Sequence, residues 1–249
     1  MSEHIIVERR GAVNVIRINR PDKKNALTFA MYDAMAAALT AGEQDEAVRA
    51  HVLLGVPGAF SSGNDLSDFM RIASGETKGL EVFGFLRALA TLEKPIVSGA
   101  DGIAVGIGTT IHLHCDLTFA TPRTEFRTPF VDLGIVPEAG SSLLVPAVLG
   151  RQPAFALLVM GDPLPAADAK AGGLIHAVVN EQELEAAVFA AADRLAAKPA
   201  NALRTAREFM RGPRDTILAR IDEESKAVRK GLASQEARDA FAAFFSRKK

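Results

Sequence analysis

Short apolar runs and longer amphipathic segments alternate along the first part of the chain, which is the pattern of an α/β protein. Apolar and polar residues alternate over His4–Arg9 and Val13–Asn19, with a glycine between them, and this predicts a β-hairpin. Thr28 is a candidate N-cap for a helix that ends near Ala41. A nearly continuous apolar run over Val48–Val56 predicts a central strand, because both of its faces would be buried.

The remainder of the chain becomes steadily more helical. The predicted strands are Pro95–Ser98 (ending at Gly99), Asp116–Ala120, Thr124–Arg127 and Leu174–Val179. The predicted helices begin near Asp65 and Val105 and cover Gly79–Glu93, Gln152–Met160, Pro165–Ala171, Asp215–Gly231 and Ser234–Arg247. From residue 181 onward the pattern is entirely helical. We therefore expect a mixed α/β core over residues 1–198 and a helical region over residues 199–249.

Phenylalanines recur at helical spacing in the last predicted helix, at Phe241, Phe244 and Phe245. An apolar helix face of this kind requires a partner surface, from the same chain or from another. We interpret it as the contact surface of an oligomer.

Composition narrows the range of partners and compartments. Of the 249 residues, 48% are hydrophobic, which is ample for a buried core, and the net charge of −1 favours neither nucleic acid nor an anionic membrane as a partner. No apolar run approaches the roughly 18 residues of a membrane span. The N-terminus lacks the pattern of a signal peptide. The single cysteine, Cys115, excludes an intramolecular disulfide and fits a reducing compartment, so we predict a cytoplasmic protein.

Candidate chemistry is concentrated between Lys94 and Pro146. Gly102, Gly106 and Gly108 lie where a helix is expected to begin, and the unpaired N–H groups of a helix start can bind partial negative charge. Some thirty residues later, Glu138 is expected at the head of a second helix. Taken alone, the glycines are equally consistent with a tight turn, and the glutamate with a favourable helix-dipole interaction.

Several separated motifs share their order and spacing with one known family. They are RPDKKNAL, AFSSGNDLSDF, SGADGIAVGIG, TEFRTPFVDLGIVPEAGSS and KPANALRTAREFM. Together they resemble the enoyl-CoA hydratase/isomerase (crotonase) family, and SGNDL, TPF and PEAGSS resemble its peroxisomal-type Δ3,Δ2-enoyl-CoA isomerase branch. The resemblance implies an α/β fold, a spiral of ββα units, with a C-terminal helical region that drives assembly of a homotrimer or a hexamer made of two trimers.

The resemblance also implies how the site works. The backbone N–H groups of Asn64 and Ile107 match the family's oxyanion hole, which stabilises a thioester enolate. The family commonly has glycine at the second position, so we expect the Ile107 side chain to narrow or redirect the acyl pocket. The two glutamates of the family's hydratases match Thr110 and Phe130, neither of which can act as a general base. Glu138 matches the single catalytic glutamate of the isomerase branch.

An apolar wall formed by Phe130, Leu133 and Val136 is expected to raise the pKa of Glu138. Asp132 is the second carboxylate in this segment, and we interpret it mainly as a loop or capping residue. The predicted reaction shifts the double bond of a 3-enoyl-CoA to the 2-position. Two alternatives remain: a hydratase that works through other residues, and a non-catalytic member of the fold that binds acyl-CoA.

Coenzyme A is expected only as part of the substrate, with no permanently bound cofactor. We expect the Lys23–Lys24 turn to meet its phosphates. The other expected substrate contacts are Ala26, Ser62, Gly63, Asp65, Leu66, Gly106 and Phe130, with capping of the following helix as the favoured role of Asp65. His112, His114, Cys115 and Asp116 are residue types that bind metals, but their spacing would not aim them at one point, so we predict no metal site.

Overall fold

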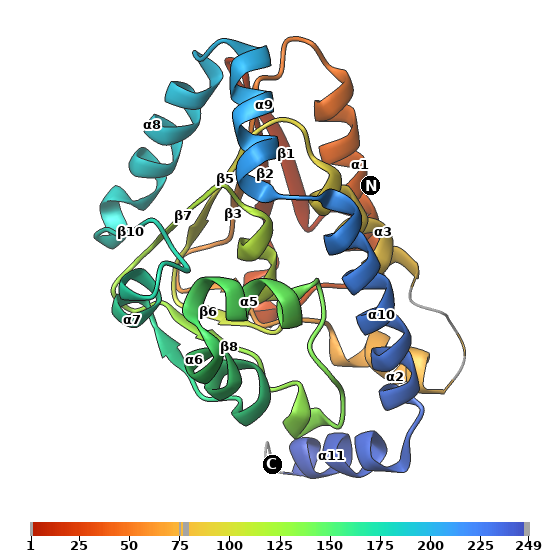
Figure 1. Cartoon of the computed structure of the whole chain (residues 1–249). Helices are drawn as coiled ribbons and strands as arrows, with labels where there is room; N and C mark the ends of the chain where they lie inside the picture. Colours follow the sequence, from red (N-terminus) through yellow and green to blue (C-terminus); the bar gives the residue numbers. More distant parts are fainter. Residues whose placement is uncertain (1, 75, 77–79, 247–249) are drawn as a thin grey trace.

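Strands and helices alternate along the chain as far as residue 178, and helical segments alone follow (Figure 1). The computed structural model describes residues 2–74, 76 and 80–246. The strands are β1 (Ile5–Arg10), β2 (Val13–Ile18), β3 (Ala50–Leu54), β4 (Ala59–Ser61), β5 (Ile96–Ala100), β6 (Ile103–Val105), β7 (Leu117–Ala120), β8 (Glu125–Arg127), β9 (Leu164–Pro165) and β10 (Ala177–Val178). The α-helices are α1 (Phe29–Gln44), α2 (Leu66–Ala73), α3 (Leu80–Thr91), α4 (Ile107–Thr110), α5 (Ser141–Leu149), α6 (Arg151–Phe155), α7 (Ala166–Ala171), α8 (Leu184–Ala196), α9 (Ala200–Arg211), α10 (Arg214–Leu232) and α11 (Gln235–Ser246). Short turns of 3-10 helix are η1 (Pro21–Lys23), η2 (Ile111–His114), η3 (Val131–Leu133) and η5 (Glu181–Glu183), and η4 (Ala156–Met160) is a π-helical turn.

Pairs of consecutive strands build two sheets at once. A sheet of six strands has the order β1-β2-β3-β5-β7-β10, and a sheet of four has the order β4-β6-β8-β9. In each of the pairs β3–β4, β5–β6 and β7–β8, the first strand joins the larger sheet and the second joins the smaller one. Within each sheet these strands run parallel. The turns that follow β4, β6 and β8, the second strands of these pairs, therefore all lie on the same side of the structure.

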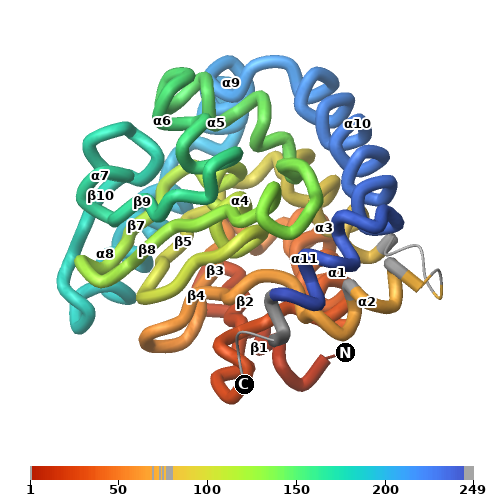
Figure 2. The backbone as a smooth tube through the Cα atoms, turned by 90° about the horizontal axis from the view of Figure 1, so that it is seen from below, coloured from red at the N-terminus to blue at the C-terminus, as the bar shows by residue number. Residues whose placement is uncertain are grey.

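The larger sheet is covered on both faces, as the continuous apolar run of β3 predicted. Val52 and Leu54 face a core layer formed with α8, whereas Leu53 faces the layer formed with α1 and α3. Figure 2 shows α8 on the side of the sheet opposite to α1 and α3. The N-terminal hairpin is confirmed, with β1 and β2 antiparallel, and so is the helix that begins after Thr28, although α1 continues to Gln44.

The C-terminal helices fold back onto their own chain. Helix α10 packs against α2, α3 and α5, and α11 packs against η3 (Figure 1). Phe241 is only 2% exposed, in a cluster with Ile135 and Leu232. Of the two alternatives that the sequence left open, the partner surface of Phe241 comes from the same chain, so the interpretation of this residue as part of an oligomer contact is wrong. The side chains of Phe244 and Phe245 lie outside the described residues.

Several predicted boundaries are wrong for local reasons. Strand β5 continues through Gly99 to Ala100, because glycine here lets the strand pack closely against Leu54 and α8. The segment at Val105 is strand rather than helix, and the helix that follows it has only four residues before it tightens into η2. The predicted strand Leu174–Val179 shrinks to β10. Gly79 and Arg247, the predicted ends of two helices, lie outside the described residues.

Candidate active site

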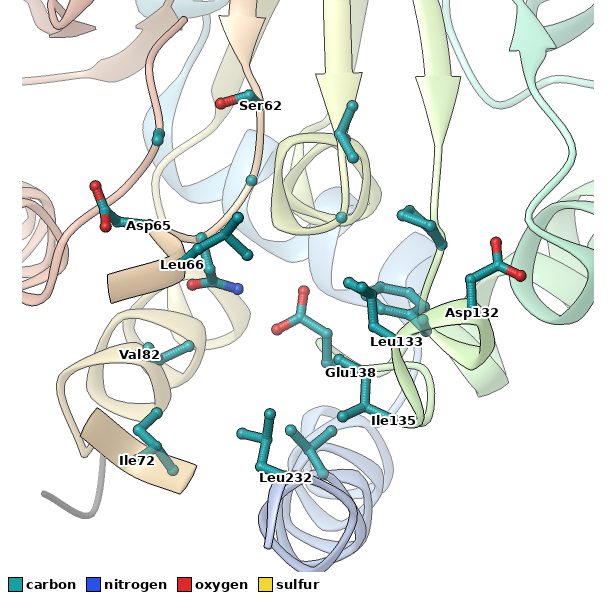
Figure 3. A pocket seen from close by; sticks show the side chains of 18 of the residues that line it. Ser62, Asp65, Leu66, Ile72, Val82, Asp132, Leu133, Ile135, Glu138 and Leu232 are labelled. Carbon is teal, nitrogen blue, oxygen red and sulfur yellow. The ribbon is translucent and has the colours of Figure 1, made fainter. Parts of the chain in front are cut away.

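A pocket of about 1260 Å³ lies between the turns that follow β4 and β6, the loop before α5, and the helices α2, α10 and α11 (Figure 3). One end of the pocket is apolar, where Ile72 from α2, Val82 from α3, Ile135 from the loop and Leu232 from α10 converge. Ser62 lies at the opposite end, on the turn after β4. The pocket therefore combines an apolar chamber with a polar end built from turns.

The turn at Asn64 leaves a backbone donor available. Leu27 N–H donates to the Gly63 carbonyl at 2.8 Å, and Asp65 N–H donates to the Leu27 carbonyl at 2.8 Å. Because successive N–H groups of an extended segment point to opposite sides, the intervening N–H of Asn64 points away from Leu27. No hydrogen bond among the described residues uses this N–H group, and Asn64 lines the pocket.

A second available donor follows Gly106. This residue has φ 59° and ψ −120°, a conformation that favours glycine, and it is the N-cap of α4. Ile107 is the first residue of the helix, so its N–H has no partner within α4, and none is found elsewhere in the described part of the chain. The Ile107 side chain is fully buried in the main core. The expectation that it narrows the acyl pocket is therefore wrong.

The two turns touch each other backbone to backbone. A Cβ atom on Gly63 would lie 2.9 Å from the Val105 carbonyl oxygen, and one on Gly108 would lie 2.6 Å from the Ser61 carbonyl oxygen. Only glycine permits these approaches. They bring the turn that carries Asn64 next to the start of α4, which carries Ile107, so the two available N–H groups belong to neighbouring segments.

Glu138 lies in the loop before α5 rather than at the head of that helix. Gly140 is the N-cap and Ser141 the first helical residue, so the expected position of Glu138 at a helix start is wrong. Ala139 and Gly140 both have positive φ, 62° and 73°, and positive φ is uncommon for a residue other than glycine. These two residues turn the chain sharply, and the Glu138 carboxylate points into the middle of the pocket (Figure 3).

Burial controls the protonation of this carboxylate. Glu138 is 8% exposed, and removal from water raises its pKa from 4.5 to about 7. The Thr110 hydroxyl donates a hydrogen bond of 3.0 Å to Glu138 Oε1, and this contact opposes the rise in pKa. A carboxyl group with a pKa near neutrality can both take and return a proton at physiological pH.

The predicted apolar wall is confirmed in part. Phe130 is 4% exposed and lines the pocket, and a Cβ atom on Gly106 would lie 4.0 Å from its ring. Leu133 also lines the pocket (Figure 3), whereas Val136 is exposed. Asp132 is exposed on η3, and its carboxylate points away from Glu138.

The other predicted substrate contacts meet at the polar end of the same pocket. Lys24, Ala26, Ser62, Gly63, Asp65, Leu66 and Gly106 all line it. Ser62 N–H donates to the Lys24 carbonyl at 2.9 Å, which joins the basic turn to the turn after β4. Asp65 caps α2 by accepting from Ser67 N–H, as predicted, and forms an ion pair of 2.6 Å with Arg20. Their roles in substrate binding remain predictions.

Both histidines of the segment after α4 are buried and hydrogen-bonded within the chain. His112 Nδ1 is 2.9 Å from Ser98 Oγ, and His114 Nε2 is 2.8 Å from the Ala139 carbonyl oxygen. Burial lowers the pKa of His112 to about 3 and that of His114 to about 4. In the described part of the chain, no three His, Cys, Asp or Glu residues are grouped so that they could hold a metal ion.

Three site residues were missed by the sequence analysis or given no role in it. Thr110 was considered only as a replacement for a glutamate, although it contacts Glu138. The Tyr32 hydroxyl donates to Asn64 Oδ1 at 2.6 Å and so holds the turn. Glu224 contacts the loop after Glu138. A signal for Glu224 existed, because it falls on the apolar face of α10 at helical spacing from the apolar residues Ile221, Val228 and Leu232.

Consecutive strands of this fold join two different sheets, and the pocket is built from the turns after the second strand of each pair. These two features define the crotonase class of α/β folds. The chain matches the family model described as enoyl-CoA hydratase/isomerase over residues 8–249. It therefore belongs to the enoyl-CoA hydratase/isomerase family.

None of the helices in the described residues is long and apolar enough to cross a membrane.

Individual relatives agree with this assignment. Enoyl-CoA delta isomerase 2 of Rattus norvegicus is 35% identical over 253 residues, which cover 99% of this chain and 64% of that relative. The chain thus spans less than two thirds of that protein. The solved structure of OdaA from Pseudomonas aeruginosa has 38% identity and a TM-score of 0.93, covering 98% of this chain and 99% of the other. An enoyl-CoA hydratase/isomerase from Pseudoalteromonas atlantica T6c has 34% identity and a TM-score of 0.93, covering 98% of each chain.

Proposed function

We propose that the protein is a Δ3,Δ2-enoyl-CoA isomerase. The observation that carries the proposal is the position of Glu138, a buried carboxylate with a pKa of about 7 that points into the pocket lined by the turn at Asn64. The resemblance to delta isomerases supports the same reaction. Thr110 and Phe130, at the positions of the hydratase glutamates, argue against hydration because neither can activate water as a base.

In the proposed reaction, the thioester oxygen of a 3-enoyl-CoA accepts hydrogen bonds from the N–H groups of Asn64 and Ile107. The Glu138 carboxylate removes a proton from C2, and the electron pair moves into the thioester to form a dienolate. The protonated Glu138 then returns the proton at C4, so that the double bond lies between C2 and C3. No atom is gained or lost, and one base on one face of the substrate is sufficient.

Coenzyme A is the proposed carrier of the acyl group. Lys23 and Lys24 lie at the polar end of the pocket, where they would meet its phosphates. The apolar chamber around Ile72, Val82 and Leu232 would hold the acyl chain away from water. No permanently bound cofactor takes part in this reaction.

A homotrimer, or a hexamer of two trimers, is the proposed assembly. Phe209 and Met210 on α9 are 82% and 89% exposed, and adjacent large apolar side chains at such exposure are typical of a contact surface. Sedimentation at micromolar concentration tests this proposal, and a monomer would contradict it. The cytoplasmic location stays a prediction.

The reaction is tested by supplying trans-3-hexenoyl-CoA and trans-2-hexenoyl-CoA separately to the wild type and to Glu138→Gln. Formation of the conjugated thioester is followed by absorbance, and formation of 3-hydroxyacyl-CoA by mass spectrometry. We expect isomerisation by the wild type and a loss of about a hundredfold or more in the variant, the scale of general-base removal. Asp132→Asn, which changes an exposed carboxylate of the same pocket, is the control and should retain activity.

Two outcomes would contradict the proposal. Hydration of the 2-enoyl substrate that survives Glu138→Gln would mean that water is activated by other residues. Tight acyl-CoA binding without turnover, unchanged by the substitution, would identify a non-catalytic binding protein.

A further inference from the structure

A carboxylate from the C-terminal helices lies against the loop that carries Glu138. Glu224 on α10 is 6% exposed. It accepts hydrogen bonds from Gly140 N–H at 2.6 Å, from Ser142 N–H at 3.0 Å and from the Ser142 hydroxyl at 2.6 Å. Gly140 is the N-cap of α5 and has no side chain with which to cap it. Glu224 thus supplies, from 84 positions further along the chain, the capping group that α5 lacks.

The hydrogen bond between Glu224 and Gly140 lies two residues from Glu138, the proposed base. Between Glu138 and Gly140 there is only Ala139, whose positive φ makes the turn sharp. His114 holds the Ala139 carbonyl from the other side, at 2.8 Å. A shift of Gly140 would therefore be transmitted directly to the direction of the Glu138 side chain, because no flexible segment separates the two residues.

The same face of α10 also lines the pocket. Val228 and Leu232 follow Glu224 at intervals of four residues, which places them on one side of the helix. Both are buried and line the acyl chamber. Helix α10 therefore joins two parts of the site: the wall of the chamber and the anchor of the catalytic loop.

We propose that Glu224 is a positioning residue for Glu138, because its buried carboxylate fixes the loop that aims the base and its negative charge acts on the base. The kinetic part of this inference rests on the proposed isomerase function. The structural and electrostatic part does not, because it concerns two carboxyl groups of the protein itself.

The negative charge of Glu224 changes the pKa of Glu138 in the same direction as burial does. A like charge disfavours ionisation, so Glu224 contributes to raising the pKa of Glu138. Other charged or titratable groups lie near this pair: Arg220 on α10, which donates to Ser142 Oγ at 3.3 Å, His114 on η2, which contacts the Ala139 carbonyl, and Tyr32 on α1, which interacts with Glu138. Burial also raises the pKa of Glu224.

The inference is tested first without catalysis. Side-chain carboxyl carbons are labelled with ¹³C and titrated by NMR, and the signal of Glu138 is assigned by its loss in Glu138→Gln. We expect Glu224→Gln to lower the titration midpoint of Glu138 by about one pH unit. Glu223→Gln, the same change at the exposed neighbouring position, should leave it unchanged. A midpoint of Glu138 that is the same in Glu224→Gln and in the wild type would overturn the inference.

The kinetic arm separates positioning from mere stabilisation. For isomerisation, we expect Glu224→Gln to lower kcat about tenfold with little change in KM, and to move the rising limb of the pH profile to lower pH. A residue needed only for folding would reduce stability and leave the pH profile of the folded enzyme in place, which would refute the positioning role.

Two further outcomes can be distinguished: a variant that does not fold, and a wild type that does not isomerise enoyl-CoA. If Glu224→Gln does not fold, Ser142→Ala removes one donor to Glu224, and we expect the Glu138 midpoint to move in the same direction by a smaller amount; no movement refutes the inference. If the wild type does not isomerise enoyl-CoA, the proposed function fails, while the NMR titration still decides whether Glu224 acts on Glu138.

Discussion

Replacing Glu138 by Gln should stabilise the fold above neutral pH at the same time as it removes the proposed base. Burial raises the pKa of Glu138 from 4.5 to about 7. The native state therefore holds this proton more tightly than the unfolded chain does. The resulting stabilisation is complete below the unfolded pKa, near 4.5, and is lost as the pH rises through the folded pKa, near 7.

The size of the effect follows from the size of the shift. At 1.36 kcal/mol for each unit of pKa, the free energy of unfolding of the wild type should lose about 3 kcal/mol over this window from Glu138 alone. Gln has nearly the same shape, carries no charge and keeps an oxygen that can accept from Thr110. The variant should therefore not show this loss.

The measurement is urea denaturation followed by circular dichroism at pH 4.5 and pH 8.5, at one fixed protomer concentration. Near pH 4.5 the wild type and Glu138→Gln should differ little. Near pH 8.5 the variant should be more stable by about 3 kcal/mol, while Asp132→Asn, at an exposed position, should show no such trend. A difference in unfolding free energy between wild type and Glu138→Gln that is the same at both pH values would refute the reasoning.

Two further substitutions test the surroundings of the base and the two turns. Thr110→Val removes the hydroxyl that donates to Glu138 Oε1, a contact that lowers the pKa of Glu138. The pH midpoint of kcat/KM should therefore rise by about one unit. An unchanged midpoint would show that the hydrogen bond has no influence on the pKa of Glu138. Gly108→Ala places a Cβ atom 2.6 Å from the Ser61 carbonyl oxygen, which should displace the donors of the proposed oxyanion hole and lower kcat/KM about a hundredfold. Gly84→Ala, where nothing lies within 4 Å of the new Cβ, is the matched control, and equal activity of the two alanine variants would contradict the prediction.

The sequence located the parts of the site better than it located their local structure. The motif at Asn64 and the glycines around Ile107 were recognised as turns with backbone donors, and both turns lead into helices. In contrast, Glu138 was assigned to a helix that begins only at Ser141. The pattern Pro137–Glu138 is typical of a helix start, but two consecutive residues with positive φ follow it, and positive φ at Ala139 has no sequence signal.

Side-chain directions were predicted less well than backbone positions. Ile107 was expected to face the pocket and instead faces the core, because the left-handed turn at Gly106 rotates the start of α4. Phe241 was interpreted as part of an oligomer contact, yet its partners come from the η3 region and α10 of the same chain. In both cases local periodicity gives the apolar character of a residue but not the identity of its neighbours.

By itself, the sequence determined the class of fold, the central strand β3, the hairpin before it and the segments that supply the pocket. The strand and the hairpin follow from hydrophobic periodicity, which acts over a few residues, whereas the class of fold and the segments of the pocket follow from motifs shared with a known family. Only the tertiary structure decided that Thr110 and Glu224 lie close to Glu138, that burial brings the pKa of Glu138 to about 7, and that α10 lines the apolar part of the pocket. These features arise from contacts between residues as many as 84 positions apart. Burial and electrostatic coupling depend on which surfaces meet, and no local pattern records that.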